Sequence, residues 1–234
     1  EVVEALGKNG ISGNTLVIFT SDNGCSPAAK PADLESKGHY PSEQRRGYKA
    51  DIWDGGHRVP FIASWPDKVK AGTRWENPIC LTDLMATCAE IVGTKLPENA
   101  GEDSSSLLPI LTQKVNSAIQ EAIVHHSING SFAIRRGQWK LELCGSSGGW
   151  SAPKPNSPEA KGLPPVQLYD MSKEVGERQN EATTHPEIVE QLTTLLKKYV
   201  EEGRSTPGAP QKNDVAIELW KEKNGGKEGK AQTE

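Results

Sequence analysis

Asp22 and Asn23 are the first residues whose types and position suit chemistry, because they follow directly on an apolar run. That run, residues 15–19, holds four consecutive apolar side chains, which favours a short strand buried on both faces of a parallel sheet. Side chains at the carboxyl end of such a strand face the crevice where α/β sheets bind ligands. A carboxylate and an amide oxygen suit a hard cation such as Ca²⁺ or Mg²⁺. A β-turn at Asn23-Gly24 is the alternative, although no returning strand follows.

Lys49 is the second candidate for chemistry. It lies within residues 45–61, RRGYKADIWDGGHRVPF, a run that also carries three arginines and a histidine. A single lysine is usually a solvated surface cation, but this many basic side chains near the rim of the predicted crevice favour an anion pocket. His57 in this run, and His39 in the long loop before it, are further candidates for contact with a substrate. Local backbone capping or solvent exposure is the alternative for both histidines.

The composition limits the classes of function. Hydrophobic residues make up 35% and charged residues 25% of the 234 residues, and the formal net charge is -4. This balance gives no electrostatic reason to expect nucleic-acid or anionic-membrane binding. No apolar stretch approaches the roughly 20 residues that span a bilayer. The 4 cysteines include no C-x-x-C pair, which indicates neither a disulfide scaffold nor a zinc site. We therefore expect no nucleic-acid partner and no membrane insertion.

Helices and strands alternate in the first half of the chain, where they must position these residues. Residues 1–9 read as an amphipathic helix before the strand at 15–19, and residues 58–66 read as a second buried strand. A helix is predicted over 82–92, with Gly93 as its C-cap. The side chains predicted to be buried on it are Leu81, Leu84, Met85, Cys88, Ile91 and Val92. This alternation predicts an α/β fold, and a first helix without an initiator Met leads us to expect that the chain begins within a longer protein.

The composition changes near residue 112. Strand-like stretches follow, separated by turns and by a Gly/Ser/Pro-rich loop over 145–165, which we expect to be flexible and which carries Trp150. A helix with one apolar stripe is predicted over 186–202. Strands followed by one amphipathic helix indicate an antiparallel sheet with a helix on one face. The predicted parts are an α/β domain at 1–111, an α+β subdomain at 112–205 and an extended, largely disordered tail at 206–234.

Several of these stretches together resemble the second half of type I, formylglycine-dependent, arylsulfatase-like sulfatases of the alkaline phosphatase superfamily. The motifs that carry the resemblance are NTLVIFTSDNG, RGYKADIWDGGHRVPFIASWP, LTDLMATCAEIVG and LYDMSKEVGERQN, in this order. The resemblance covers residues 1 to about 205. It implies an alkaline-phosphatase-like sulfatase fold, in which residues 1–111 are the C-terminal part of the large catalytic domain.

The resemblance also implies roles for individual residues. Asp22 and Asn23 match metal ligands, most often for Ca²⁺ and less often for Mg²⁺. Lys49 matches the lysine that contacts the sulfate and the bridging ester oxygen. As the S–O bond breaks, charge builds on the leaving oxygen, so a fixed ammonium stabilises the transition state more than the ground state. A metal does the same for the nonbridging sulfate oxygens.

The sequence contains no match to the nucleophile of the family, a formylglycine made from a Cys or Ser with Pro two and Arg four residues on. Cys25 begins a similar stretch, CSPAA, but Ala29 occupies the Arg position. Cys25 also follows the predicted metal-binding turn directly, whereas the modified residue of the family lies far upstream. We therefore expect the formylglycine in an N-terminal half that precedes this chain, and we expect the chain alone to be inactive.

The resemblance predicts a sulfuric ester hydrolase in the full-length protein. It implies sulfate monoesters, chiefly of sulfated carbohydrates, as substrates and a periplasmic or extracellular location. Two alternatives stay open. A phosphoesterase or phosphonate hydrolase of the same superfamily uses related metal-binding turns, and a non-catalytic remnant would keep only affinity for sugar. Comparing aryl sulfate with aryl phosphate turnover distinguishes the first, and the upstream sequence distinguishes the second.

Overall fold

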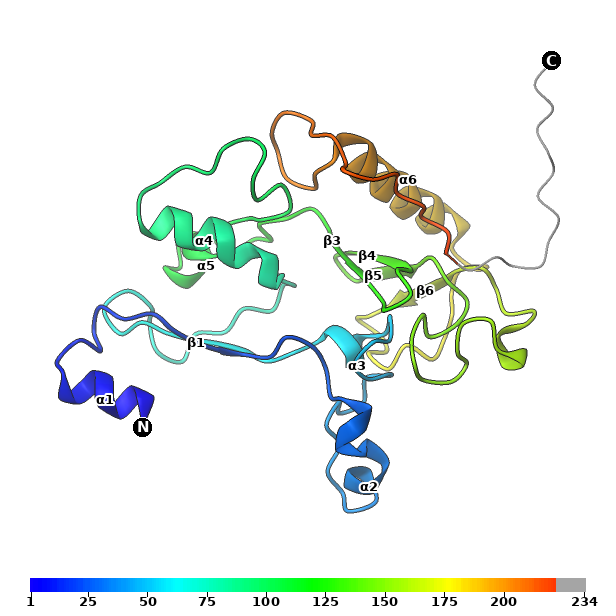
Figure 1. Cartoon of the computed structure of the whole chain (residues 1–234), viewed down its shortest axis with the longest axis horizontal. Helices are drawn as coiled ribbons and strands as arrows, with labels where there is room; N and C mark the ends of the chain where they lie inside the picture. The colour runs from blue at the N-terminus through cyan, green and yellow to red at the C-terminus, as the bar shows by residue number, and fades with distance from the viewer. Residues whose placement is uncertain (222–234) are drawn as a thin grey trace. The chain divides into compact units, whose positions relative to one another are not determined.

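The computed structural model describes residues 1–221, and Figure 1 shows the course of the chain through its helices and strands. These residues form two compact units that are interleaved along the chain. The first unit holds residues 1–22, 59–123 and 195–216, and the second holds residues 23–58, 124–194 and 217–221. The linear boundaries predicted from the sequence stay a prediction.

The first unit contains a two-stranded sheet. Strand β1 (Val17–Thr20) pairs antiparallel with β2 (Phe61–Ser64). The prediction of a parallel sheet around residues 15–19 is therefore wrong for the described residues, and so is burial on both faces, because Phe19 is 64% exposed. A short apolar run specifies an extended segment, but the direction of its neighbour depends on how the intervening chain returns to it.

Helices α1 (Val2–Lys8) and α4 (Leu84–Ile91) of the first unit lie close to their predicted positions, whereas the short helix α5 (Leu108–Leu111) was not predicted. The 3₁₀ turn η2 (Leu81–Asp83) precedes α4. The fully buried Asp83 carboxylate accepts hydrogen bonds from the N–H groups of Cys80 (2.9 Å) and Ser105 (2.9 Å). This carboxylate therefore caps the start of the helix and ties it to the following loop. Burial raises the pKa of Asp83 against the effect of these hydrogen bonds.

The face of α4 that is buried differs from the predicted one. Met85 is 49% and Val92 74% exposed, whereas Thr87 and Ala89 are buried. The Thr87 hydroxyl accepts a hydrogen bond from the N–H of Leu107 (2.8 Å), which turns this side of α4 toward the rest of its unit. Apolar spacing alone identified the helix but selected the wrong face.

The second unit contains a four-stranded sheet in the order β3-β4-β5-β6. The strand bounds are β3 Ile123–His126, β4 Phe132–Arg136, β5 Trp139–Glu142 and β6 Gln167–Asp170. β4 pairs antiparallel with β5, and β5 pairs antiparallel with β6, which confirms the antiparallel sheet predicted for this part of the chain. Short helices α2 (Pro31–Glu35) and α3 (Asp54–His57) and the 3₁₀ turns η1 (Pro27–Ala29) and η3 (Pro158–Ala160) complete this unit.

The long helix α6 (Pro186–Glu202) matches the predicted range. Its buried side chains are Leu192, Leu195, Leu196 and Tyr199, all on the predicted stripe. Gly203 follows with a φ of 62°, a left-handed conformation that glycine adopts without a steric penalty at the end of a helix. Of the predicted disordered tail, residues 206–221 carry neither helix nor strand, and residues 222–234 lie outside the described residues.

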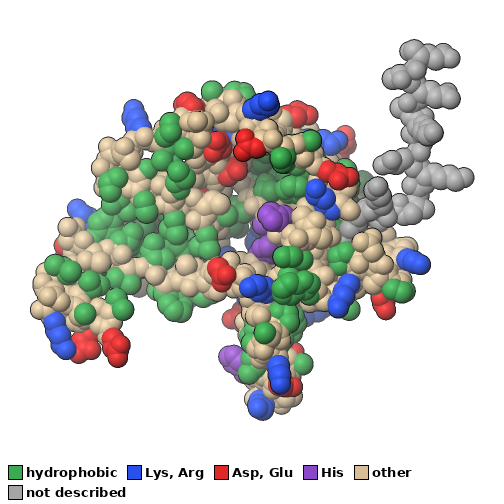
Figure 2. Space-filling view, in the orientation of Figure 1, with side chains coloured by type: hydrophobic (Ala, Val, Ile, Leu, Met, Phe, Trp, Pro, Cys, Tyr) green, Lys and Arg blue, Asp and Glu red, His purple; other side chains and the backbone are tan. Residues whose placement is uncertain are grey.

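Among residues 1–221, no helix is long and apolar enough to cross a membrane. Charged side chains of both signs are interspersed with hydrophobic ones on the face shown in Figure 2. This mixture agrees with the small net charge of the sequence.

Candidate functional site

Two backbone hydrogen bonds join the turn at Asn23 to the loop that carries Lys49 and to α3, which follows that loop. The N–H of Gly24 donates to the carbonyl of Gly56 (2.9 Å), and the N–H of Lys49 donates to the carbonyl of Cys25 (2.9 Å). All of these residues belong to the second unit. The structure therefore brings together two of the segments that the sequence singled out.

Glycine is required where the two segments meet. A Cβ on Gly24 would lie 1.8 Å from the carbonyl oxygen of Gly55, and a Cβ on Gly55 would lie 2.0 Å from the carbonyl oxygen of Gly47. The obstructing atoms are backbone atoms, which cannot rotate away as a flexible side chain would. The paired glycines of the DGG stretch thus allow the Asn23 turn, α3 and the Lys49 loop to pack backbone against backbone.

Asp51 supports the Lys49 loop from inside the protein. Its fully buried carboxylate accepts hydrogen bonds from the N–H of Tyr48 (2.9 Å), and from the N–H of Trp150 (2.9 Å) and of Ser151 (3.0 Å). The Ser151 hydroxyl donates to the same carboxylate. One acidic side chain therefore links the residue before Lys49 to the loop that follows β5.

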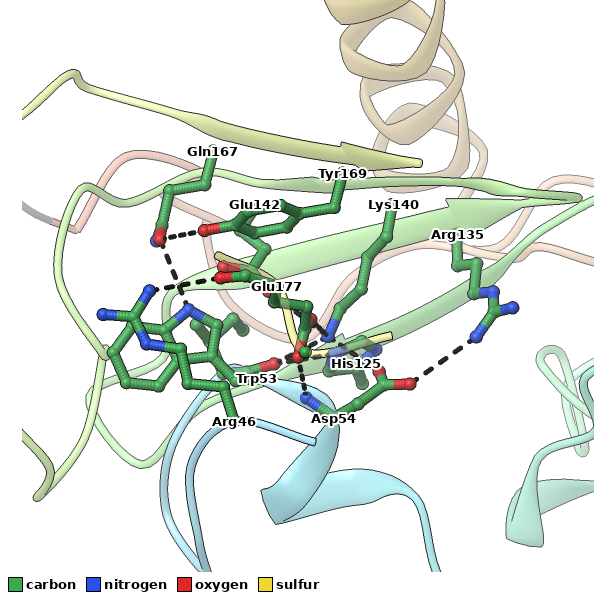
Figure 3. Close-up of polar contacts among 12 residues, drawn as sticks. Arg46, Trp53, Asp54, His125, Arg135, Lys140, Glu142, Gln167, Tyr169 and Glu177 are labelled. Carbon is green, nitrogen blue, oxygen red and sulfur yellow. Dashed lines mark hydrogen bonds and ion pairs between the residues drawn. The ribbon is translucent and has the colours of Figure 1, made fainter. Parts of the chain in front are cut away.

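Lys140 on β5 is the centre of a buried ion cluster next to α3. Its ammonium lies 2.9 Å from Asp54 Oδ1, 2.5 Å from Glu177 Oε1 and 3.2 Å from Glu142 Oε1, and it donates to the carbonyl of Ile52 (3.1 Å). Figure 3 shows these side chains converging from the sheet and from the loop of residues 46–54. Glu177 also accepts a hydrogen bond from the N–H of Asp54 (2.6 Å), at the start of α3. The cluster thus anchors the start of α3 to the sheet.

Burial and mutual attraction set the ionisation of this cluster. Burial opposes the charge on Lys140, but the three carboxylates outweigh it and hold the pKa of Lys140 above its ordinary value. Burial likewise opposes ionisation of Asp54, yet Lys140, with help from Arg135 at 3.6 Å, holds the pKa of Asp54 well below its usual range. Burial, aided by the neighbouring Glu177 and only partly offset by Lys140, raises the pKa of Glu142 well above its ordinary value.

The cluster brings cations and acids into direct contact. Two cations, Lys140 and Arg135, face the acidic side chains of Asp54, Glu142 and Glu177. Burial raises the pKa of Glu177 against the attraction of Lys140. Opposite charges and direct hydrogen bonds are the conditions under which ionised groups persist in a protein interior.

His57, at the end of α3, packs against His125 of β3, with ring centroids 4.2 Å apart. Burial, followed by the nearby Lys140 charge, lowers the pKa of His57 to about 4. The same two causes lower the pKa of His125 well below its ordinary value. Both imidazoles are therefore neutral near pH 7. His39, by contrast, is exposed in the segment after α2. Whether either predicted histidine contacts substrate stays a prediction.

Asp22 and Asn23 fall on either side of the division between the units. Asp22 is exposed, and the Asn23 amide nitrogen donates to the carbonyl of Gly24 (3.0 Å). A carboxylate and an amide oxygen fit the chemistry of a hard cation, but Ca²⁺ takes six to eight oxygens, so the pair would supply only part of a coordination shell. Within residues 1–221, no three His, Cys, Asp or Glu side chains gather into a metal-binding group. The predicted role of the pair as metal ligands stays a prediction.

A hollow of about 580 Å³ lies elsewhere, in the first unit, between residues 96–119 and 204–207. None of the site residues predicted from the sequence lines it.

The sequence did not predict that Asp51, Lys140 and Glu177 hold the Lys49 loop and α3 in place. One signal was available for Lys140, because Lys140 and Glu142 are two apart on a strand and must share one face of the sheet. No local signal identified the carboxylates that this face would meet, since they come from distant segments.

The chain is similar to known sulfatases in sequence and in structure. The sulfatase family matches residues 1–94. N-acetylgalactosamine-6-O-sulfatase of Bacteroides thetaiotaomicron is 34% identical over 84% of this chain and 38% of its own length. A solved structure from the same organism, described with the metabolism of multiple glycosaminoglycans, has 31% identity and a TM-score of 0.71 over 84% of this chain and 41% of its own.

A second solved structure, Ps i-CgsB in complex with k-i-k-neocarrahexaose, has 27% identity and a TM-score of 0.64 over 85% of this chain and 39% of its own length. The chain thus spans well under half the length of the relatives that it matches. Both structural matches confirm the predicted alkaline-phosphatase-like sulfatase fold. The motifs, the fold and the aligned relatives agree, and the chain belongs to the sulfatase family.

Proposed function

We propose that this chain carries part of the active site of a sulfuric ester hydrolase that acts on sulfate monoesters. The observation that supports this most strongly is the backbone junction between the Asn23 turn and the Lys49 loop. This junction keeps Asn23, which offers an oxygen ligand, and the cation Lys49 on neighbouring segments. These segments cannot separate without breaking the close packing at Gly24 and Gly55. Such fixed groups are what stabilisation of a transferring anionic group requires.

Lys49 neutralises the charge that develops on the leaving oxygen. Its loop is fixed on three sides, by the carbonyl of Cys25, by Asp51 and, through α3, by Lys140. Because the loop is already ordered, little reorganisation accompanies the reaction, and the ammonium favours the transition state over the bound ester.

Asp22 and Asn23 would hold a cation, with Ca²⁺ preferred to Mg²⁺ because Ca²⁺ accepts more oxygen ligands in less regular geometry. When bound, the cation supplies positive charge to the nonbridging sulfate oxygens. The nucleophile, a formylglycine, has no motif in this chain and would come from another part of the full-length protein. Cys25 is excluded from that role by the alanine at position 29.

Sulfated carbohydrates are the proposed substrate class. The names of two relatives, an N-acetylgalactosamine-6-O-sulfatase and a protein solved with a neocarrahexaose, support this choice. His39 and His57 are the proposed donors to sugar hydroxyls, and neutral imidazole at position 57 suits that use. A periplasmic or extracellular location is proposed with the same substrate class.

Replacing Lys49 with Ala in the full-length protein tests the proposal. Loss of one preorganised charge-stabilising donor lowers kcat by about 10²–10³-fold in comparable sites. We expect that loss on an aryl sulfate, with unchanged thermal unfolding, because the Lys49 side chain makes no hydrogen bond or ion pair with any residue in the described part of the chain. Lys37→Ala, at an exposed lysine in the same unit, is the matched control and should be neutral.

An unchanged rate in the Lys49→Ala variant would remove Lys49 from the mechanism. Faster wild-type turnover of the matching aryl phosphate than of the aryl sulfate would instead favour the phosphoesterase alternative. A full-length protein that binds sugar sulfates and hydrolyses neither ester would favour the non-catalytic alternative.

A further inference from the structure

Trp150 stands out in the loop after β5. The side chain is 48% exposed, whereas the four residues before it, 146–149, are all buried. Tryptophan is among the side chains that most often dominate the binding energy of an interface. We propose that Trp150 is a stacking platform for a pyranose ring of the sulfated substrate, beside Lys49; this inference rests on the proposed function.

The loop that carries Trp150 is held in one conformation, contrary to the flexibility predicted from its Gly/Ser/Pro content. The N–H of Ser147 donates to the carbonyl of Pro153 (2.9 Å), and the Ser147 hydroxyl donates to the carbonyl of Ser151 (2.7 Å). The carbonyl of Ser147 accepts from the N–H of Ile52 (2.8 Å). The loop is therefore closed on itself and tied to the segment after Lys49, so little conformational entropy is lost when a ligand binds.

The same loop packs against Ala50, after Lys49, and is linked through one carboxylate to Tyr48, before Lys49. The N–H groups of Tyr48 and Trp150 bind the two oxygens of a single carboxylate, that of Asp51. On the other side, a Cβ on Gly149 would lie 2.5 Å from the carbonyl oxygen of Ala50. A single carboxylate therefore connects the backbone of Trp150 to the backbone of the residue that precedes Lys49.

Ala50 adds an independent sign that this junction is specialised. Its φ of 84° is a left-handed conformation, which a residue with a Cβ rarely adopts. The carbonyl of Ala50 accepts a hydrogen bond from the N–H of Ile128 (2.9 Å), which holds this strained conformation. Strained backbone of this kind is concentrated at ligand-binding and catalytic sites.

A pyranose ring fits the chemistry of this surface. One face of the ring presents C–H bonds that form a flat apolar patch, which an indole can cover, while the hydroxyls at the ring edge stay free for hydrogen bonds. The stretch from Cys144 to Pro153 contains no charged residue, so it offers no cation to the sulfate. We therefore assign the neutral ring to Trp150 and the sulfate to Lys49.

The test compares Trp150→Ala, Trp150→Phe and the matched control Trp220→Ala, at another exposed tryptophan that is 42% exposed in the same unit. In the full-length protein, kcat and KM are measured on N-acetylgalactosamine 6-sulfate and on 4-nitrophenyl sulfate. Loss of the indole should raise KM for the sugar ester by roughly 10-fold, the size of one good aromatic contact. The Phe variant should recover most of that loss, the rise in KM should be larger for the sugar ester than for 4-nitrophenyl sulfate, and all constants of Trp220→Ala should stay near wild type.

A direct binding measurement separates this inference from the proposed function. Saturation-transfer NMR on desulfated N-acetylgalactosamine should show contact from its ring protons in the wild type and Trp150→Phe proteins, and none in Trp150→Ala. If the wild type hydrolyses no sulfate ester but this pattern appears, the proposed function fails and the platform stands. A KM for the sugar ester within about 2-fold of wild type in Trp150→Ala, or an effect confined to thermal stability, overturns the platform.

Discussion

Replacing Lys140 with Met asks whether the buried ion cluster holds α3 and, through it, the Lys49 loop. The side chains of Lys140 and Glu177 are 0% exposed, and that of Asp54 is 10% exposed. Removing the ammonium leaves two carboxylates facing each other in a region that water does not reach. Breaking one member of a buried ion pair in this way costs about 3–5 kcal/mol of unfolding free energy.

The structure places the expected loss near the lower end of that range. Arg135 lies 3.6 Å from Asp54 and stays in place to offset one stranded charge. Burial already favours the protonated form of Glu142, so this third carboxyl adds little repulsion. We therefore expect a loss of about 3 kcal/mol in Lys140→Met, and recovery of roughly half of it in the double variant Lys140→Met/Glu177→Gln, which removes one of the two stranded charges.

Urea denaturation of the full-length protein, followed by circular dichroism, measures these differences. The matched control is Lys173→Met, whose side chain is 65% exposed and pairs with Asp170 at 3.2 Å. An exposed pair of this kind contributes about 0–1 kcal/mol, so the control should be close to wild type. A loss in Lys140→Met no larger than in the control, or a double variant less stable than the single one, would refute the reasoning.

Two further predictions concern the same unit. Gly55→Ala should lower sulfatase activity by more than about 100-fold, because its Cβ would collide with the carbonyl of Gly47 and displace the Lys49 loop. The control is Gly7→Ala, where the new Cβ meets nothing closer than 3.8 Å. Equal activity in the two variants would contradict the packing argument. His57→Gln should flatten the acid side of the stability profile. Burial lowers the pKa of His57 from 6.5 to about 4, so the unfolded chain binds the proton more readily, and stability that is complete above pH 6.5 falls by up to about 3 kcal/mol as the pH drops to 4. Urea midpoints between pH 4 and 7 measure this, and a slope equal to that of the wild type would show that the pKa of this imidazole is not depressed.

The sequence alone indicated the family and predicted much of the local structure. Side-chain type and order in the motifs around Asp22, Asn23 and Lys49 indicated the family. The helix α6 and the antiparallel strands of the second unit were also predictable, because apolar periodicity, a proline at a helix start and a glycine at its end act within a few residues.

Other features depended on residues that are far apart along the chain. The antiparallel direction of β1 and β2 and the buried face of α4 belong to this class, as does the fixed conformation of the Trp150 loop. The sequence around Trp150 suggested flexibility, since Gly, Ser and Pro favour turns. Its order comes from the carboxylate of Asp51, which lies 100 positions from Ser151.

The ion cluster shows the same limit most clearly. A lysine within a strand reads as a solvent-facing residue, and nothing next to Lys140 in the sequence shows that Asp54 and Glu177 will meet it in the interior. A buried charge is tolerated only when its partners are already in position, and only the tertiary fold sets those positions. Local sequence thus determined which groups are available for chemistry, and long-range packing determined which of them are held together.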